Sequence, residues 1–338
     1  MVPDDVAAAW GWRPGAVSAH AGGLINKTFV VRDEAGSPIA ALQQLHPIFG
    51  AEVNLDIDAV TSHLAARGLV TPRLLRTRDG RAWLDHDGRV WRALSWVAGE
   101  SVHTVPSPAW AEVGGQLVGR FHRGVADLAH DYKFTRTGVH HTQAHLAKLR
   151  DRVAGGGDTE AVDLGRQILA AADALPALPE LPRRHVHGDL KISNLVFQRI
   201  PLAGVCLVDL DTVARGTLAF ELGDAMRSWC NPLGEDVTEA RLDVAVFDAA
   251  VRGFRSEADG VITADERGSI PIGLELVCIE LAARFAVDVF DDSYFGWDPE
   301  RFATRRAHNL VRARGQLSLG RAVRESRKGL LDALLVGG

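Results

Sequence analysis

The sequence predicts an α+β fold in which strands dominate the first third of the chain and helices dominate the rest. Short runs of β-branched and apolar residues, separated by turn residues, mark strand candidates at 28–31, 39–42, 70–75, 82–84 and 90–96. One amphipathic helix interrupts them, because apolar residues recur every three or four positions through 52–67. From Ser107 onwards the apolar residues follow helical spacing. Strands followed by helices are typical of a small sheet joined to a separate helical part.

Length and composition indicate a globular protein with two lobes. At 338 residues the chain is too long for one small core, so we expect an N-terminal lobe at 1–96 and a C-terminal lobe at 97–338. The net charge of −5 gives no reason to expect nucleic acid or an anionic membrane as a partner. No apolar run approaches the roughly 20 residues that span a bilayer. Three widely spaced cysteines and an acidic N-terminus favour the cytoplasm, and the oligomeric state stays open.

The first two strand candidates form a predicted hairpin, because turn residues at 34–38 separate them. Gly22 and Gly23 precede this hairpin, and Asn26 and Lys27 stand at its entrance. Glycines in this position let backbone N–H groups approach the phosphates of a nucleotide. The same residues also suit an ordinary hairpin turn, since they match neither G-x-G-x-x-G nor a Walker A sequence.

Helices are predicted at 107–122 and through 142–175, before a proline-rich stretch that leads into the next strand. His141 and His145 are four residues apart and could suggest a metal site. No third ligand with a suitable spacing is apparent, however. Thr142 as the N-cap of a helix explains this segment better.

One segment concentrates the residues that carry chemistry. An apolar run leads into His187-Gly188-Asp189, Asn194 follows five residues later, and a second apolar run delivers Asp209. This is the spacing of a kinase catalytic loop and metal-binding strand. One carboxylate must lie beside the attacking hydroxyl, while an amide oxygen and a second carboxylate hold Mg²⁺ against the nucleotide phosphates. His-Gly-Asp alone is typical of a turn, so the prediction depends on the joint pattern.

This segment resembles the aminoglycoside-phosphotransferase-like family of small-molecule kinases, in which His-Gly-Asp replaces the His-Arg-Asp of protein kinases. The Asp189-x-Lys191 pair, the run 208–212 and Gly223-Asp224 look most like N-acetylhexosamine 1-kinases. The resemblance implies a two-lobed protein-kinase-like fold. Its N-lobe would hold a small antiparallel sheet and one long helix, and its C-lobe would be larger and mainly helical.

The resemblance also implies ATP and Mg²⁺ as cofactors and a role for each matching residue. Asp189 would orient the acceptor hydroxyl as a base-like residue, and Lys191 would steady the γ-phosphate. Asn194 and Asp209 would bind Mg²⁺. Asp224 would brace the catalytic loop through hydrogen bonds to its backbone.

The N-terminal lobe departs from the kinase pattern. A kinase carries a lysine on the third strand to pair with the nucleotide phosphates, but Gln43 stands at that place here. Lys27 is a candidate for the missing charge, although it equally suits a solvated hairpin lysine. Without a strand lysine, Asp56 and Asp58 of the long helix are expected on the surface. Trp96, at the predicted crossing between the lobes, is a candidate for the apolar adenine slot or for simple core packing.

Four further residues are candidates for contacts with the acceptor. The resemblance directs Asp211 and Arg227 toward it. Arg284 shares one helix face with two carboxylates, an arrangement that suits internal ion pairs as well as substrate contact. Arg312 lies in the stretch 308–316, which again resembles the sugar 1-kinases.

The expected function is ATP-dependent phosphoryl transfer to a sugar hydroxyl, with the anomeric hydroxyl of an N-acetylhexosamine as the preferred acceptor. The strongly basic C-terminal stretch favours a neutral or anionic small molecule over a polycation. The alternatives within the family are an aminoglycoside, choline or amino-alcohol, or homoserine kinase. From a different class, a nucleotide-binding pseudokinase that serves as an interaction module would explain Gln43.

Overall fold

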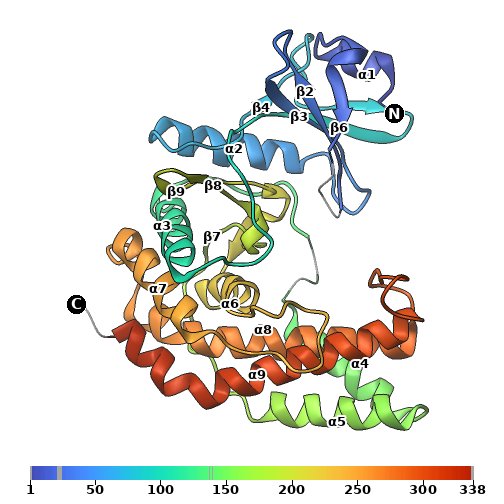
Figure 1. The fold of residues 1–338 in the computed structure, drawn as a ribbon, viewed down its shortest axis with the longest axis vertical. Coiled ribbons are helices and arrows are strands. Elements are labelled where there is room, and N and C mark those ends of the chain that lie inside the picture. The colour runs from blue at the N-terminus through green and yellow to red at the C-terminus, as the bar shows by residue number, and fades with distance from the viewer. Residues whose placement is uncertain (1, 21–24, 137, 139, 336–338) are drawn as a thin grey trace.

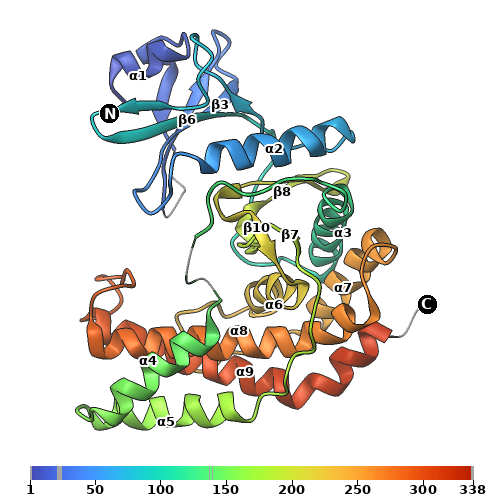
Figure 2. The same ribbon diagram turned by 180° about the vertical axis from the view of Figure 1, so that it is seen from behind.

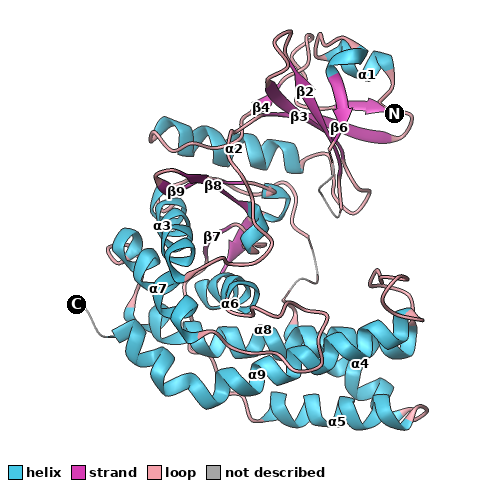
Figure 3. Ribbon diagram, in the orientation of Figure 1, coloured by secondary structure: helices cyan, strands magenta, loops and turns pink. Residues whose placement is uncertain are grey.

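The structure is a computed structural model that describes residues 2–20, 25–136, 138 and 140–335. Its strands gather mainly at one end of the molecule, and its helices fill the other end (Figure 1). The prediction of an α+β chain with a small sheet and a larger helical part is confirmed (Figure 3). Within the described ranges, every helix is too short or too polar to cross a membrane.

The N-terminal sheet is antiparallel, with strand order β1-β2-β3-β6-β4, and β5 also pairs with β6. Its strands are β1 (Val17–Ala19), β2 (Lys27–Arg32), β3 (Pro38–Gln44), β4 (Leu74–Leu75), β5 (Leu84–His86) and β6 (Arg89–Ser95). The predicted hairpin is β2–β3, and this expectation is confirmed. The register of β3 and β6 places Gln43 directly opposite Arg92. Helix α1 (Asp4–Ala9) closes the outer face with Val6, which is fully buried.

The segment after β6 leads into the second lobe. The backbone of Glu100 exchanges two hydrogen bonds with that of Phe197, 2.9 and 2.8 Å long. These bonds tie the crossing segment to a strand of the second lobe. The division at residues 96 and 97 stays a prediction.

Helix α2 (Val53–Ala66) lies between the sheet and the second lobe (Figures 1 and 2). Its apolar side joins the core of that lobe through Val53, Ile57, Val60 and Leu64. The expectation that Asp56 lies on the surface is wrong, because its side chain is fully buried. Its carboxylate accepts the backbone N–H groups of Lys133 and Phe134 and contacts His130. Asp58, by contrast, is partly exposed and pairs with Arg76.

The second lobe consists of helices around two short hairpin-like sheets, β7 with β10 and β8 with β9. Its strands are β7 (Arg184–Val186), β8 (Leu195–Arg199), β9 (Leu202–Leu207) and β10 (Ala214–Gly216). Its helices are α3 (Pro108–Gly124), α4 (Thr142–Ala154), α5 (Thr159–Asp173), α6 (Leu218–Trp229), α7 (Val244–Ala258), α8 (Ala264–Asp291) and α9 (Arg305–Leu335). The long helices α8 and α9 run side by side beneath α6 (Figures 1 and 2). The β7–β10 and β8–β9 pairs therefore lie between α2 and this helical layer.

Thr142 does not act as the N-cap that the sequence predicts. Helix α4 begins at Thr142 without a side-chain cap, and the Thr142 hydroxyl instead donates to Glu280 of α8. His145 contacts the carbonyl oxygen of Gly138. In the described part of the chain, no group of three or more His, Cys, Asp or Glu side chains is arranged to hold a metal ion. The segment therefore attaches α4 to α8.

Helices α3 and α7 cross so closely that the contact admits only glycine. A Cβ added at Gly253 would lie 1.9 Å from the carbonyl oxygen of Glu112. We expect Gly253→Ala to lower the free energy of unfolding by about 1–3 kcal/mol, because overpacking forces the helices apart. Denaturant unfolding measures this loss. Gly260→Ala is the matched control, since nothing lies within 4 Å of its added Cβ, and equal effects of the two changes would contradict the packing argument.

Candidate active site

The loop after β7 carries the His-Gly-Asp motif into the space between the lobes. His187 is fully buried, and its ring donates from Nε2 to the carbonyl oxygen of Val208 at 2.9 Å. Burial lowers the pKa of His187, so the ring is neutral. Gly188 has φ of +82°, and an added Cβ would lie 2.5 Å from the carbonyl oxygen of Thr212. Glycine is therefore required at the turn that presents Asp189.

Glu221 of α6 anchors this loop. Its two carboxylate oxygens accept the backbone N–H groups of His187 and Gly188 at 2.7 and 2.9 Å. His122 of α3 lies 3.4 Å away, and the Glu221 side chain is 1% exposed. Burial alone would raise the pKa of Glu221, but His122 and the amide donors outweigh it and hold the pKa below its ordinary value. The bracing role expected of Asp224 thus belongs to Glu221, one helical turn earlier.

Two predicted carboxylates, those of Asp189 and Asp209, lie near the ammonium group of a third predicted residue, Lys191. The Nζ atom of Lys191 lies 2.6 Å from Asp189 and 3.8 Å from Asp209. Burial would lower the pKa of Lys191, but the Asp189 and Asp209 carboxylates outweigh it and raise the pKa. Asn194 donates from its side-chain amide to the backbone carbonyl of Asp189 at 2.8 Å, and its backbone carbonyl accepts the N–H of Val208. Asn194 thus ties the catalytic loop to the segment that carries Asp209.

The donor set around Asp209 fits a hard divalent cation such as Mg²⁺. Asp209 lies two residues after β9, has φ of 63° and ψ of 54°, which is a left-handed conformation, and carries a partly exposed carboxylate. Burial and the neighbouring Asp211 raise the pKa of Asp209 to about 6. Its negative charge is therefore incompletely compensated by the protein. Asn194 offers an amide oxygen, and oxygen atoms are the ligands that Mg²⁺ prefers.

The side chains of Asp211 and Gln43 are both hydrogen-bonded to a residue that the sequence did not single out. Arg92 of β6 donates to both carboxylate oxygens of Asp211. Its Nε also donates to the side-chain oxygen of Gln43 at 2.9 Å. Asn26 adds a third hydrogen bond to Asp211, 2.6 Å long. The signal that could have found Arg92 is a charged residue inside the apolar run of β6.

The remaining nucleotide-site candidates lie at the sheet. Lys27 is exposed at the start of β2. The ring of Trp96 lies edge-on to His20, with centroids 5.9 Å apart. Gly22 and Gly23 lie outside the described residues. The roles of these residues stay predictions.

A pocket of about 200 Å³ adjoins the predicted catalytic residue Asp189. Asp189 and Asp209 both line it, and Ile25 and Phe49 contribute from the N-terminal lobe. Gly188, Val277 and Leu281 also line it, and the remaining lining residues are polar: Arg136, His140, Asp211, Thr212, Asp224, Arg227, Glu280 and Arg284. A second pocket of about 530 Å³ shares Arg136 and Arg284 with the first. The site can thus hold a small polar molecule next to Asp189.

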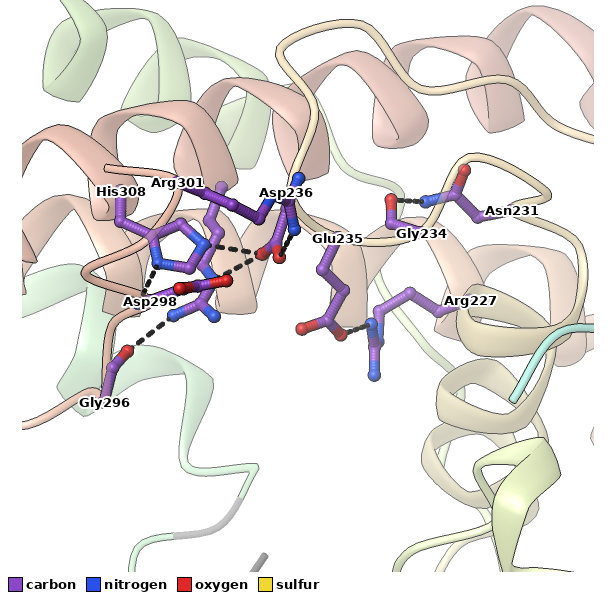
Figure 4. A network of polar contacts seen from close by, with 10 residues as sticks. Arg227, Asn231, Gly234, Glu235, Asp236, Gly296, Asp298, Arg301 and His308 are labelled. Carbon is purple, nitrogen blue, oxygen red and sulfur yellow. Dashed lines mark hydrogen bonds and ion pairs between the residues drawn. The ribbon is translucent and has the colours of Figure 1, made fainter. Parts of the chain in front are cut away.

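Most charges of this lining are already paired. Arg227 binds Asp224 at 2.9 Å. Figure 4 shows its second ion pair, with Glu235. The carboxylate of Glu280 is engaged by His140 and Thr142. Burial would lower the pKa of His140, but Glu280 outweighs it and raises the pKa.

Two arginines of the lining, Arg284 and Arg136, are exceptions among the described residues. Among the described residues no carboxylate lies within ion-pair distance of the Arg284 guanidinium, which packs over the rings of Phe295 and Tyr294 at 5.6 and 6.0 Å. Arg136 lines the same pocket, and its guanidinium donates to the hydroxyl of Tyr294 at 3.3 Å. An acceptor would therefore meet several neutralised pairs and two guanidinium groups, those of Arg136 and Arg284, for which the described residues supply no carboxylate partner.

Arg312 does not line either pocket at the site. Its Nε donates to Asp236 at 2.9 Å, and its terminal nitrogen donates to the carbonyl oxygen of Gly296 at 2.8 Å. His308 and Arg301 contact the same Asp236 (Figure 4). This network fastens the loop after α6 to the start of α9. Arg312 can therefore affect the acceptor only through that loop.

Comparison with known proteins agrees with this geometry. The model of the phosphotransferase enzyme family, APH, matches residues 16–254. Relatives include the homoserine kinases of Granulibacter bethesdensis and Pseudomonas aeruginosa PAO1, each 27% identical over 84% of this chain, and covering 83% and 86% of their own lengths. Neither of these relatives is a sugar kinase.

Solved structures share the fold. The structure of the amicoumacin kinase hAmiN in complex with AMP-PNP, Ca²⁺ and Ami aligns over 93% of this chain and 91% of its own, with a TM-score of 0.64 and 14% identity. An aminoglycoside phosphotransferase from Alicyclobacillus acidocaldarius aligns over 99% of this chain and 96% of its own, with a TM-score of 0.62 and 16% identity. At this level of identity the likeness concerns the fold, and the two-lobed kinase-like architecture is confirmed.

Proposed function

This chain belongs to the phosphotransferase enzyme family, and from that premise we propose that it transfers the γ-phosphoryl group of ATP to a hydroxyl of a small polar acceptor. The observation that carries the proposal is that Asp189 and Asp209 both line one pocket and both lie beside the ammonium group of Lys191. Asp189 orients the acceptor hydroxyl and takes its proton. The hydroxyl oxygen then bonds to the γ-phosphorus as the bond to the ADP oxygen breaks.

The other residues of the site hold the reacting groups in place or compensate the negative charge of the phosphates. Lys191 holds the Asp189 carboxylate and, from its place beside Asp209, can neutralise the transferring phosphoryl group. A divalent cation held by Asn194 and Asp209 would, when bound, draw negative charge from the nucleotide phosphates. Glu221 keeps the loop in place through two backbone hydrogen bonds. Such catalysis is mainly positioning and electrostatics.

Homoserine is the first candidate acceptor. The relatives that cover most of this chain carry that activity in their names. The uncompensated guanidinium of Arg284 suits the carboxylate of an amino acid, since guanidinium and carboxylate groups pair in a bidentate manner. The pocket of about 200 Å³ suits a molecule of this size.

A sugar is the second candidate, and a specific feature of the pocket favours it. In this pocket, Asp224 and Glu280 are each already engaged, by Arg227 and by His140 with Thr142. They therefore offer oriented hydrogen-bond groups rather than a free negative charge for an ammonium group. Neutral hydroxyl and amide groups fit that lining. A polycationic aminoglycoside fits it poorly, because it needs an acidic pocket.

An acceptor panel decides between these candidates. We would measure ADP release by the purified protein with ATP and Mg²⁺ in the presence of homoserine, N-acetylglucosamine, N-acetylgalactosamine, choline and kanamycin. Product identification by mass and phosphorus NMR then fixes the hydroxyl. ATP binding without transfer to any acceptor would instead support the pseudokinase alternative.

Arg284 gives an independent test of the acceptor. We expect Arg284→Gln to raise the acceptor KM about 10-fold to 100-fold, because a hydrogen bond to a charged group contributes about 1.5–3 kcal/mol. The KM for ATP should not change. Arg284→Lys should recover part of the affinity if the acceptor carries a carboxylate. Arg252→Gln on α7, whose side chain is 61% exposed, is the control, and an unchanged acceptor KM in Arg284→Gln would remove Arg284 from the acceptor site.

A further inference from the structure

The structure lacks the usual charged pair of a kinase N-lobe at its usual place. Gln43 stands on β3 where a lysine is expected, and its side-chain nitrogen donates to Thr28 at 3.1 Å. None of the three acidic residues near the start of α2, Glu52, Asp56 and Asp58, is hydrogen-bonded to Gln43, and Glu52 is exposed. The carboxylate of Asp56 accepts hydrogen bonds from the backbone N–H groups of Lys133 and Phe134, and Asp58 forms an ion pair with Arg76. The strand and helix therefore form no ion pair with each other in the described residues.

A different buried pair lies one strand away. Arg92 occupies the β6 position in register with Gln43, and its side chain is 1% exposed. It binds both oxygens of Asp211, whose side chain is also 1% exposed. A bidentate guanidinium–carboxylate pair has a fixed geometry. The pair therefore sets the position of the 3₁₀ turn Leu210–Thr212 relative to the N-terminal sheet.

This turn follows directly on Asp209. Asp209 is its N-cap residue and holds a left-handed conformation. Asp adopts this conformation more readily than most residues, but it still costs energy outside glycine and is kept by the surrounding structure. Asn26 reaches the same Asp211 carboxylate, and its own side-chain oxygen accepts the N–H of His46 at 2.9 Å. The buried cluster of Arg92, Asn26 and Asp211 thus connects the sheet and the segment before β2 to the turn that follows Asp209, the predicted metal ligand.

From this connectivity we infer that Arg92 is a positioning residue that takes the place of the missing strand lysine, acting through Asp211 on Asp209 and on the placement of the N-terminal sheet. It does so without touching the nucleotide, because its guanidinium is buried and all of its described hydrogen bonds go to Gln43 and Asp211. The inference deepens the proposed phosphoryl transfer and rests on it. On this inference Asp211 affects the binding of the nucleotide and its metal ion, through Asp209, and does not contact the acceptor.

The test uses Arg92→Met, which keeps the length of the apolar stem and removes the charge. We expect the affinity for ATP·Mg²⁺, measured by calorimetry, to fall about tenfold or more, and kcat to fall with it, since a small misplacement of a catalytic group costs about 10²-fold in rate. The acceptor KM should stay within about twofold, below the scale of one lost hydrogen bond. Arg92→Lys should recover part of both losses. Arg89→Met, an exposed position on the same strand, is the control.

A second variant keeps the inference testable if Arg92→Met folds poorly. Asp211→Asn preserves shape, and we expect it to reproduce the loss of ATP·Mg²⁺ affinity with an unchanged acceptor KM. If Asp211→Asn raised the acceptor KM and left ATP·Mg²⁺ affinity intact, Asp211 would be an acceptor contact and the inference would be wrong. If both variants had a lower Tm but wild-type kinetic constants, the Arg92–Asp211 pair would only stabilise the fold, and the inference would be wrong. Calorimetry with ATP·Mg²⁺ needs no acceptor, so a failure to find any acceptor would count against the proposed function alone.

Discussion

Replacing Asp189 with asparagine is expected to lower kcat about 10²–10⁴-fold, the usual contribution of a positioned proton acceptor, while ATP·Mg²⁺ still binds. Asparagine has nearly the same shape and can keep a contact with Lys191, whose Nζ lies 2.6 Å from the carboxylate. It cannot take a proton from the acceptor. Steady-state kinetics with the best acceptor of the panel, together with calorimetry for the nucleotide, measures the two effects separately.

The control for this change is Asp163→Asn, an exposed carboxylate of α5 that pairs with Arg166 on the surface. It should leave both constants unchanged. Turnover by Asp189→Asn at the wild-type rate would show that another group accepts the proton. An equal loss of nucleotide affinity and kcat would instead place Asp189 among the residues that bind the nucleotide.

Glu221→Ala is expected to be the most destabilising single change at the site. It leaves the buried N–H groups of His187 and Gly188 without an acceptor, at a cost of about 1–3 kcal/mol each. Because these amides fix the turn before Asp189, kcat should fall even where the protein remains folded. Denaturant unfolding and steady-state kinetics measure the two losses. Glu325→Ala, an exposed glutamate on α9, is the control, and a wild-type stability of Glu221→Ala would contradict the anchoring role.

The acid sensitivity of the fold gives a second readout of Glu221. Its pKa in the folded protein lies below the ordinary value near 4.5. The unfolded chain therefore binds the proton first, and the stabilisation from this carboxylate is present above that pH and is lost as the pH falls through the folded pKa. Glu221→Gln should lack this component, so its free energy of unfolding should fall less steeply with decreasing pH below 4.5. If the free energy of unfolding fell equally steeply with pH in Glu221→Gln and in the wild type, the proposed contribution of the Glu221 carboxylate would be contradicted.

Some of the site could be predicted because its residues are close in sequence. Asp189, Lys191 and Asn194 lie within one loop and its short turn, and Asp209 follows two residues after the strand that pairs with β8, so local geometry brings them together. The helix α2 could likewise be predicted from its apolar spacing. Which residue braces the loop could not be predicted in this way. Glu221 and Asp224 are three positions apart on one helix, and only the rotation of α6 against the loop selects Glu221.

The sequence by itself determined the α+β arrangement, the catalytic loop and its oxygen-bearing side chains, since these follow from residue type and from spacing over a few positions. Only the tertiary structure decided which charges meet. It paired Arg92 with Asp211 across 119 positions, buried Asp56 against the 130–134 segment and turned Arg312 to Asp236. The physical reason is that a buried charge needs a partner from whichever element packs against it, and that element is set by the folded topology rather than by neighbours along the chain.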